Sequence, residues 1–210
     1  MGKVVVIDPG HGGNTTIAGS GANHGIGPSG LLEKNIALKV SVKIAEILNE
    51  KMYDVSLTRN NDTNLSLKDR AKVSLVKEAD VFVSIHFNDH TNPIIQGTET
   101  WVDIGASSKS KLLASSIQQK LVLATGLKNR GVKSKSLDVL DLRFHYPTTA
   151  TCLVEISFIS DSEEEKRLKK DTYINSIANS IVVGITDFFN NSSSINILKP
   201  IISSDPVCEE

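Results

Sequence analysis

The sequence predicts a single α/β domain with a central, twisted, mostly parallel (mixed) sheet of about six strands and helices on both faces. Three observations predict it. Short apolar runs rich in β-branched residues alternate with longer segments whose apolar residues recur at helical spacing. The length of 210 residues fits one domain. Hydrophobic residues make up 40% of the chain, which is enough to form a core.

The first part of the chain reads as strand, loop, helix and strand. Residues 3–7 are apolar and β-branched, as in a strand buried on both faces, and Asp8-Pro9-Gly10 follows as a turn. The next twenty residues, rich in Gly, Asn and Ser, predict a long loop of the kind that is either functional or disordered. A helix over 32–50 then places four apolar residues on one face: Ile36, Val40, Ile44 and Ile47. Residues 53–58 predict the second strand.

The middle of the chain repeats this alternation. Ser66, followed three residues later by Asp69, resembles a capping box that opens a helix running to residue 78. The inner face of this helix is predicted to hold Leu67, Ala71 and Leu75. The remaining predicted elements are strands over 79–86 and 98–102, a helix over 109–125 ended by Gly126, a weaker strand over 137–142, a buried strand over 151–158, and helices over 162–170 and 172–189.

The composition excludes several classes of protein. Lys and Arg number 23 and Asp and Glu number 24, and this balance argues against a protein built to bind nucleic acid or an anionic membrane. One locally basic segment is interpreted as a solvated loop, because no aromatic residues interleave Lys128, Arg130, Lys133 and Lys135. No apolar window is long enough for a transmembrane helix. No signal peptide is recognised, so we expect synthesis in the cytoplasm, with a mature form or an excised domain as the alternative.

The chain contains two cysteines, which are too few for a disulfide framework. Cys152 lies in an apolar run and is expected to be a small buried residue, whereas Cys208 lies in a polar tail. His90 and His145 follow strand-like segments and are expected at the surface. Residues 190–210 begin with a Ser/Asn-rich composition typical of linkers, so the folded domain is predicted to cover residues 1–189.

Four side chains suited to metal or acid–base chemistry fall at one predicted edge of the sheet. His11 lies just past the first strand, His86 ends the third strand, and Glu155 lies in the strong late strand. Glu33 opens the first helix and faces the glycine-rich loop. Ligands of open parallel sheets bind beyond the carboxyl ends of the strands. Two histidines and one carboxylate form a zinc pattern, with a further carboxylate available to transfer protons during amide hydrolysis.

Each of these residues also has a structural interpretation. Taken singly, His11 could be a loop residue and His86 a hydrogen-bonded core histidine, and Glu33 could be a charge favoured by the helix dipole. For Glu155 the functional interpretation is favoured, because an unpaired buried carboxylate is costly. His24 is interpreted as a solvent-exposed loop residue, with contact to substrate as the alternative.

Five segments together resemble the zinc-dependent N-acetylmuramoyl-L-alanine amidases of the Amidase_3 type, over about residues 3–189. They are V-V-V-I-D-P-G-H-G-G, G-L-L-E-K-N, S-L-K-D-R, A-D-V-F-V-S-I-H-F-N and L-V-E-I-S-F-I-S. The resemblance implies that His11, Glu33 and His86 bind one Zn²⁺ and that Glu155 is the catalytic acid/base. It implies cleavage of the amide between the lactyl group of N-acetylmuramic acid and L-alanine in peptidoglycan, on an α/β fold with a mixed sheet.

The sequence departs from the family pattern at three places. Phe87 stands where a small residue is common, Ser157 precedes Phe158, and the loop between His11 and Glu33 is long. The residues that contact substrate are not assigned, and the candidates are Asn88, Phe87 and His24. The segment after His86 is too short for an inserted autoinhibitory helix, so we expect an open site.

The pattern at the ends of the chain favours the catalytic domain of a phage endolysin, with residues 190–210 leading to a C-terminal wall-binding module that is missing here. The alternative with the same chemistry is a bacterial autolysin or spore-lysis amidase. Further alternatives are a metallopeptidase or deacetylase and a non-catalytic peptidoglycan-binding module. The expected partner is peptidoglycan, without nucleic acid or membrane insertion. We expect a monomer that acts at the bacterial cell wall after release.

Overall fold

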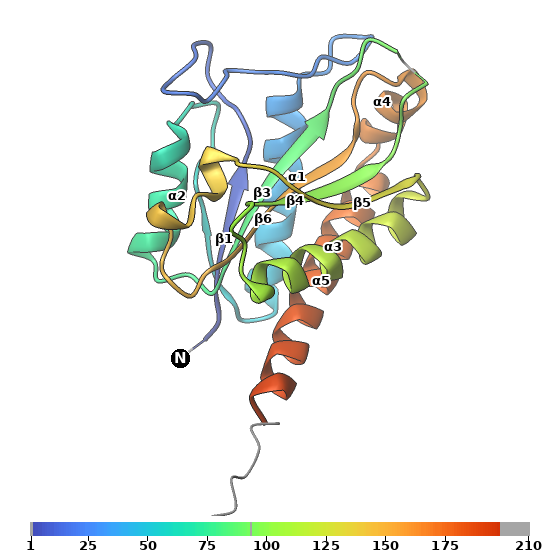
Figure 1. The fold of residues 1–210 in the computed structure, drawn as a ribbon. Coiled ribbons are helices and arrows are strands. Elements are labelled where there is room, and N and C mark those ends of the chain that lie inside the picture. Colours follow the sequence, from blue (N-terminus) through green and yellow to red (C-terminus); the bar gives the residue numbers. More distant parts are fainter. Residues whose placement is uncertain (1, 93, 198–210) are drawn as a thin grey trace, which may run out of the picture.

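The computed structural model describes residues 2–92 and 94–197, which form one six-stranded sheet with helices on both faces (Figure 1). The strand order is β2-β1-β3-β6-β4-β5. All neighbouring strands run parallel except β4 and β6, which are antiparallel. The strands are β1 (Val4–Pro9), β2 (Asp54–Leu57), β3 (Val81–Asn88), β4 (Thr98–Val102), β5 (Asn129–Ser134) and β6 (Ala150–Phe158). The predicted fold class is confirmed.

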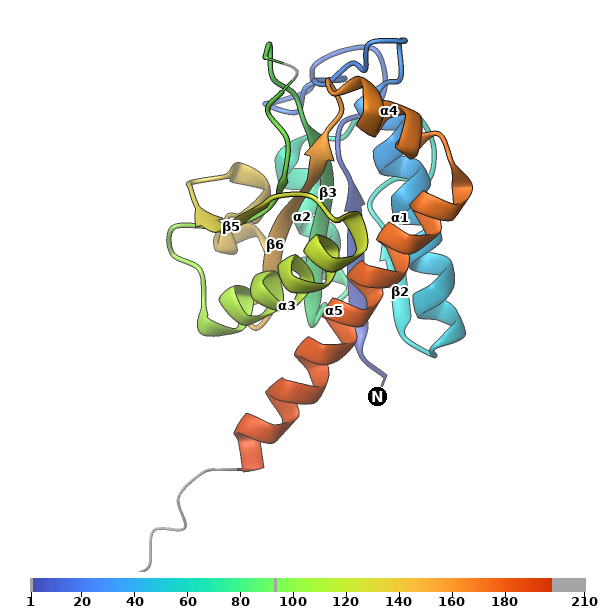
Figure 2. The same cartoon turned by 90° about the vertical axis from the view of Figure 1, so that its right-hand side faces the viewer.

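Three helices cover one face of the sheet and one covers the other (Figure 2). The first face packs against α1 (Glu33–Glu50), α3 (Ser108–Thr125) and α5 (Asp171–Ile197). The opposite face packs against α2 (Leu67–Val76) and two short 3₁₀ turns, η1 (Asp138–Leu140) and η2 (Leu142–Phe144). A further short helix, α4 (Ser162–Leu168), follows β6.

Alternation along the strands separates the two hydrophobic clusters. On β3, Val83, Ile85 and Phe87 enter the larger cluster beneath α1, α3 and α5, whereas Phe82 enters the smaller cluster on the opposite face. His86 therefore projects on the side of the smaller cluster. Both core faces are apolar, as expected for strands buried on both sides.

The helix signals in the sequence are largely confirmed. The Ser66 hydroxyl caps α2 by accepting from the Asp69 backbone N–H at 3.0 Å, and Gly126 ends α3 in the left-handed conformation with φ 67°. The predicted inner face of α2 is wrong at Leu75, which is 41% exposed. Arg70 and Ser74 are buried in its place because α2 packs on a polar network as well as on apolar side chains.

The fifth strand lies elsewhere than predicted. Residues 137–142 form parts of two 3₁₀ turns, with Val139 and Leu140 in the smaller core cluster. The strand is Asn129–Ser134, inside the basic segment that was interpreted as a loop. A strand at the edge of a sheet buries little surface and can therefore be polar. Asn129–Ser134 consequently lacks the apolar pattern from which strands were predicted.

Helix α5 is longer than predicted. It passes the expected end at Phe189 and continues to Ile197, because Asn and Ser only mildly disfavour a helix that buried Phe188 and Phe189 already anchor. The rest of the predicted tail, Cys208 included, lies outside the described residues. Cys152 is fully buried, as predicted, and burial raises the pKa of its thiol. Among the described helices, none combines the length and apolarity needed to cross a membrane.

Candidate metal centre and active site

His11, Glu33 and His86 come together at the carboxyl edge of the sheet. His11 follows β1, His86 lies near the end of the neighbouring strand β3, and Glu33 is the first residue of α1. One potential ligand atom from each residue lies within 4.8 Å of the other two. His11 Nε2 and His86 Nδ1 each lie 3.1 Å from Glu33 Oε1. The structure thus brings the three predicted metal ligands into one cluster.

The turn after β1 fixes the orientation of the His11 ring. The backbone of His11 has φ 59°, in the left-handed region that non-glycine residues rarely adopt. His11 Nδ1 lies 3.0 Å from the Gly21 carbonyl oxygen and donates to it, which directs Nε2 toward Glu33. Gly10 gives room for the second ring, since a Cβ at this position would lie 2.3 Å from His86 Cε1.

Two buried arginines hold the carbonyl groups of this turn. Arg59 donates to Pro9 O at 3.0 Å and to Gly10 O at 2.7 Å. Arg70 donates to Pro9 O and His11 O, both at 2.7 Å. The carbonyl groups of three consecutive residues are therefore fixed by guanidinium groups, which stabilises the strained backbone at His11.

Arg70 is neutralised by a buried carboxylate, Asp8. Its Nη1 lies 2.9 Å from Asp8 Oδ1, and Ser84 donates to Asp8 Oδ2 at 2.6 Å. Burial opposes ionisation of Asp8, but Arg70 and the hydrogen bonds from Ser84 and Thr58 outweigh it and hold the pKa of this carboxyl below its usual value. This network is a hydrogen-bonded support for the backbone that carries His11, one of the candidate metal ligands.

Glu33 is held as a buried anion between the two histidines. Oε2 accepts from the Gly25 N–H at 2.8 Å, and Oε1 accepts from the Phe87 N–H at 3.1 Å. Burial favours the neutral acid, but the hydrogen bonds with His11 and His86 outweigh burial and lower the pKa of Glu33. The long loop before Glu33 is ordered partly by Glu165, which accepts from the Ser29 N–H and hydroxyl and from the Leu31 N–H.

The donor set of the cluster fits a Zn²⁺ ion. His11 Nδ1 donates to a carbonyl oxygen, so in a neutral His11 the other ring nitrogen, Nε2, carries a lone pair and no proton. This lone pair faces the Glu33 carboxylate oxygen, so two hydrogen-bond acceptors face each other with no proton between them. Burial opposes protonation of His11, yet Glu33 outweighs it and raises the pKa of the imidazole. The cluster therefore attracts positive charge to the point where the ligand atoms converge, and His₂Glu is an established zinc ligand set.

Glu155 lies next to the cluster on β6. In the sheet register it pairs with His86 on β3 and with Glu99 on β4, so the three side chains form one row on the same face. Its Oε2 atom is buried and has no hydrogen-bond partner. Burial, and then the charges of Glu33 and Glu99, raise the pKa of Glu155 well above its usual value. A carboxyl in this state binds a proton more tightly than a solvated glutamate, which is a property of catalytic acids and bases.

Of the other residues considered in the sequence, Asn88 lies near the site and His24 lies at the surface, whereas Phe87 and His145 lie elsewhere than predicted. Asn88 lies beside Glu155 and donates to Glu99 at 3.0 Å. His24 is exposed, with its ring centroid 6.4 Å from that of His11. The Phe87 side chain is 1% exposed in the core, because strand alternation turns it away from His86, so it does not line the site. His145 is buried rather than at the surface and is hydrogen-bonded to Ser74.

Sequence reasoning missed Asp8, Arg59, Arg70 and Glu99 as parts of the site. Glu99 could have been found by the criterion that identified Glu155, since both are carboxylates within a predicted strand. Arg70 lies in one of the segments that resembled the family. The contacts of the arginines, however, span long stretches of chain that local patterns do not connect.

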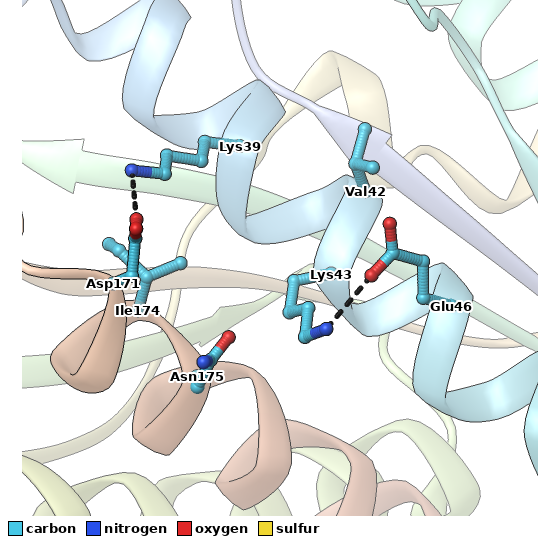
Figure 3. Close-up of a pocket in the computed structure, with 7 residues that line it drawn as sticks. All are labelled: Lys39, Val42, Lys43, Glu46, Asp171, Ile174 and Asn175. Atoms are coloured by element: carbon cyan, nitrogen blue, oxygen red, sulfur yellow. Dashed lines mark hydrogen bonds and ion pairs between the residues drawn. The ribbon is translucent and has the colours of Figure 1, made fainter.

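A separate pocket of about 440 Å³ lies between α1 and α5 (Figure 3). Its charged side chains pair with one another, Lys39 with Asp171 at 2.7 Å and Lys43 with Glu46 at 3.0 Å. These residues lie along the middle of α1 and on α5, whereas Glu33 is the first residue of α1. The pocket therefore contributes nothing to the metal cluster.

Comparison of the sequence with known proteins identifies a family. The sequence profile of Amidase_3, described as N-acetylmuramoyl-L-alanine amidase, matches residues 5–187. The amidase LytC of Bacillus subtilis is 34% identical over 190 residues, and the endolysin of Bacillus phage SPP1 is 35% identical over 198 residues. Each comparison covers 90% of this chain, which spans 36% of LytC and 67% of the endolysin.

The fold has close counterparts among solved structures. The crystal structure of an N-acetylmuramoyl-L-alanine amidase from Clostridium difficile 630 superposes with a TM-score of 0.80 at 32% identity. The comparison covers 90% of this chain and 97% of that one. The fold of this chain is therefore similar to that of a solved amidase over nearly the whole of that chain.

Proposed function

The chain belongs to the Amidase_3 family of N-acetylmuramoyl-L-alanine amidases, and from this premise we propose that it hydrolyses the amide between N-acetylmuramic acid and L-alanine in peptidoglycan with one bound Zn²⁺. His11, Glu33 and His86 would hold the ion. The observation that carries the proposal is the row formed by His86 and Glu155, in which a metal ligand lies beside a carboxyl whose buried oxygen has no partner.

The residues of the chain divide the chemistry between them. A Zn²⁺ ion bound here lowers the pKa of water and polarises a carbonyl group. Glu155 accepts a proton from the attacking water as the new C–O bond forms at the lactyl carbonyl carbon. The C–N bond then breaks, and Glu155 returns the proton to the departing nitrogen of alanine. The raised pKa of Glu155 suits both transfers, because such a carboxylate is a stronger base than an ordinary one and its acid form can then donate to the departing nitrogen.

For the biological setting we propose action at the bacterial cell wall by a monomer, as the catalytic unit of an endolysin. The endolysin of phage SPP1 and the bacterial amidase LytC are similar to this chain at nearly equal identity, so a bacterial autolysin or spore-lysis amidase is the alternative with the same chemistry. A non-catalytic binding module is disfavoured because His11, Glu33, His86 and Glu155 are all present.

The test is a digest of purified Gram-positive peptidoglycan by the zinc-loaded protein, with the Glu155→Gln variant as control. We expect new N-terminal alanine without new reducing sugar ends, and almost none of it from the variant. Release of single amino acids would support a stem-peptide metallopeptidase, and release of acetate would support a deacetylase. Either result, or no cleavage of several wall types with zinc bound, would overturn the proposed reaction.

A further inference from the structure

A pocket of about 200 Å³ opens beside Glu155, on the side away from the metal ligands. Besides Glu155 it is lined by Asn88, Glu99, Trp101, Lys135, Leu137 and Leu153. Trp101, Leu137 and Leu153 supply apolar walls, and the other side chains are polar. Small-molecule subsites commonly combine such walls with a few placed polar groups.

The carboxylate in this pocket is already neutralised. Glu99 Oε2 accepts from Arg130 at 2.7 Å and from Lys133 at 2.6 Å, and Oε1 accepts from Asn88 at 3.0 Å and Trp101 at 3.2 Å. Burial opposes ionisation of Glu99, but Lys133 and Arg130 outweigh it and lower the pKa of this carboxyl. With two cations on one oxygen, Glu99 does not make the pocket repel an anion.

Lys135 adds positive charge that no protein group neutralises. It is exposed at the end of the basic segment and lines the pocket, and among residues 2–92 and 94–197 its ammonium group has no ion-pair partner. Its backbone N–H bonds to Val102 O at 3.1 Å, which fixes the chain beside β4. Arg130 and Lys133, which lie outside the pocket lining, thus pair with Glu99, and the Lys135 ammonium group in the lining is available to a ligand.

The proposed function determines which half of the substrate reaches this pocket. If Glu155 returns a proton to the alanine nitrogen, that nitrogen lies next to Glu155, while the carbonyl faces the cluster of His11, Glu33 and His86. The peptide that continues from the nitrogen then extends from β6 toward β4 and β5, across the pocket.

We propose that this pocket is the subsite for the peptide half of the substrate and that Lys135 binds a carboxylate of that peptide just beyond the alanine. The inference rests on the proposed function for its direction. The apolar walls seat the alanine methyl group, and the Asn88 side-chain oxygen is available to accept from a peptide N–H. Lys135 is thereby a specificity-determining residue, and the ligand class is a short anionic peptide that begins with alanine.

The first test measures binding without turnover. Trp101 is the single tryptophan of the chain, so its fluorescence reports on this pocket. The probes are alanyl-glutamate and its isostere alanyl-glutamine, each with the C-terminal carboxyl blocked as an amide, so that only the glutamate probe carries a carboxylate. Each probe is used in both configurations at the second residue. We expect one configuration of the acid to change the Trp101 emission and to bind about five- to tenfold more tightly than its amide at low salt. Lys135→Met should abolish this preference.

The matched control is Lys128→Met, which removes an exposed lysine of the same basic segment that does not line the pocket. It should keep the wild-type preference for the acid. An acid preference that survives in Lys135→Met, or no response of Trp101 to any dipeptide, would overturn the subsite.

The second test uses synthetic muramoyl dipeptides with the same acid or amide at the second residue. Lys135→Met should lower kcat/KM for the acid about five- to tenfold and leave kcat/KM for the amide and the zinc content unchanged. If neither substrate is cleaved while Trp101 still reports selective binding of the acid, the proposed reaction fails and the subsite stands. If both are cleaved equally by the wild type, the role of Lys135 is wrong and the reaction stands.

Discussion

Glu33 and Glu155, the buried carboxyl groups at the centres of the two halves of the site, differ in their hydrogen bonding. In the metal half, formed by His11, Glu33 and His86 above Asp8 and Arg70, the buried carboxylates are ion-paired or hydrogen-bonded. In the acid/base half, formed by Glu155 with Glu99 and its pocket, Glu155 keeps one buried oxygen without a partner. Burial costs an unpaired carboxylate several kcal/mol, so such a group is retained only where something outside the protein interacts with it.

This difference in hydrogen bonding indicates that one half of the site positions the candidate metal ligands and the other half provides the group for proton transfer. Arg59 and Arg70 fix the carbonyl groups around His11 and give the ligands one geometry. Among the described residues, Glu155 Oε2 has no hydrogen-bond partner, and burial with the nearby charges of Glu33 and Glu99 raises the pKa of this carboxyl. Each half is thus open to a separate test.

The largest expected effect comes from removing a metal ligand. His86→Ala should abolish stoichiometric zinc and reduce turnover by about a thousandfold or more, since a catalytic metal supplies several kcal/mol of charge stabilisation. The measurement is zinc content after gel filtration, together with alanine release. His24→Ala, at an exposed position beyond His11, is the control and should keep its zinc. A His86→Ala protein with one zinc ion per chain would remove His86 from the ligand set.

Breaking the support beneath the metal half should be the next largest effect. Arg70→Met leaves Asp8 buried without its cation, and the loss of one partner of a buried ion pair costs about 3–5 kcal/mol of the free energy of unfolding. Urea unfolding of the metal-free protein measures it. Lys72→Met removes an exposed cation from the same helix and should change stability little. Equal stability of the two variants would contradict a structural role for Arg70.

The two buried carboxylates should also give pH dependences of opposite sign in the metal-free protein. The pKa of Asp8 is held below its usual value of 3.8, so the stability that it contributes is present above that pH and is lost as the pH falls through its folded pKa. The pKa of Glu155 is raised above its usual 4.5, so its contribution falls as the pH rises from 4.5 toward the folded pKa.

Glu155→Gln isolates the second of these slopes. The difference in free energy of unfolding between the variant and the wild type should grow in favour of the variant as the pH rises above about 5, and should change little at lower pH. Unfolding curves across about pH 3–8 measure it. A difference independent of pH would show that Glu155 is not a strained carboxyl in the folded protein.

The sequence placed His11, Glu33 and His86 at one edge of the sheet because each follows a strand, ends a strand or begins a helix, and the family resemblance implied their role as metal ligands. Sequence reasoning could not reach the Arg70–Asp8 pair, whose partners lie 62 residues apart. It misplaced the fifth strand, because Asn129–Ser134 is a polar edge strand without an apolar pattern. It also predicted that α5 ends at Phe189, whereas the helix continues to Ile197. The Asn- and Ser-rich segment has the composition of a linker, but it extends a helix that already packs on the core. Phe87 was a candidate for substrate contact, but its side chain lies in the core, because alternation along β3 directs it to the face opposite His86.

The most direct test of the account is to measure zinc content and turnover on one preparation of the Glu155→Gln variant, with His86→Ala beside it. If the two halves are separate, Glu155→Gln keeps one zinc ion per chain and loses alanine release by about a hundred- to ten-thousandfold. His86→Ala loses both. A Glu155→Gln protein that loses its zinc, or that retains wild-type turnover, would contradict the assignment of proton transfer to Glu155.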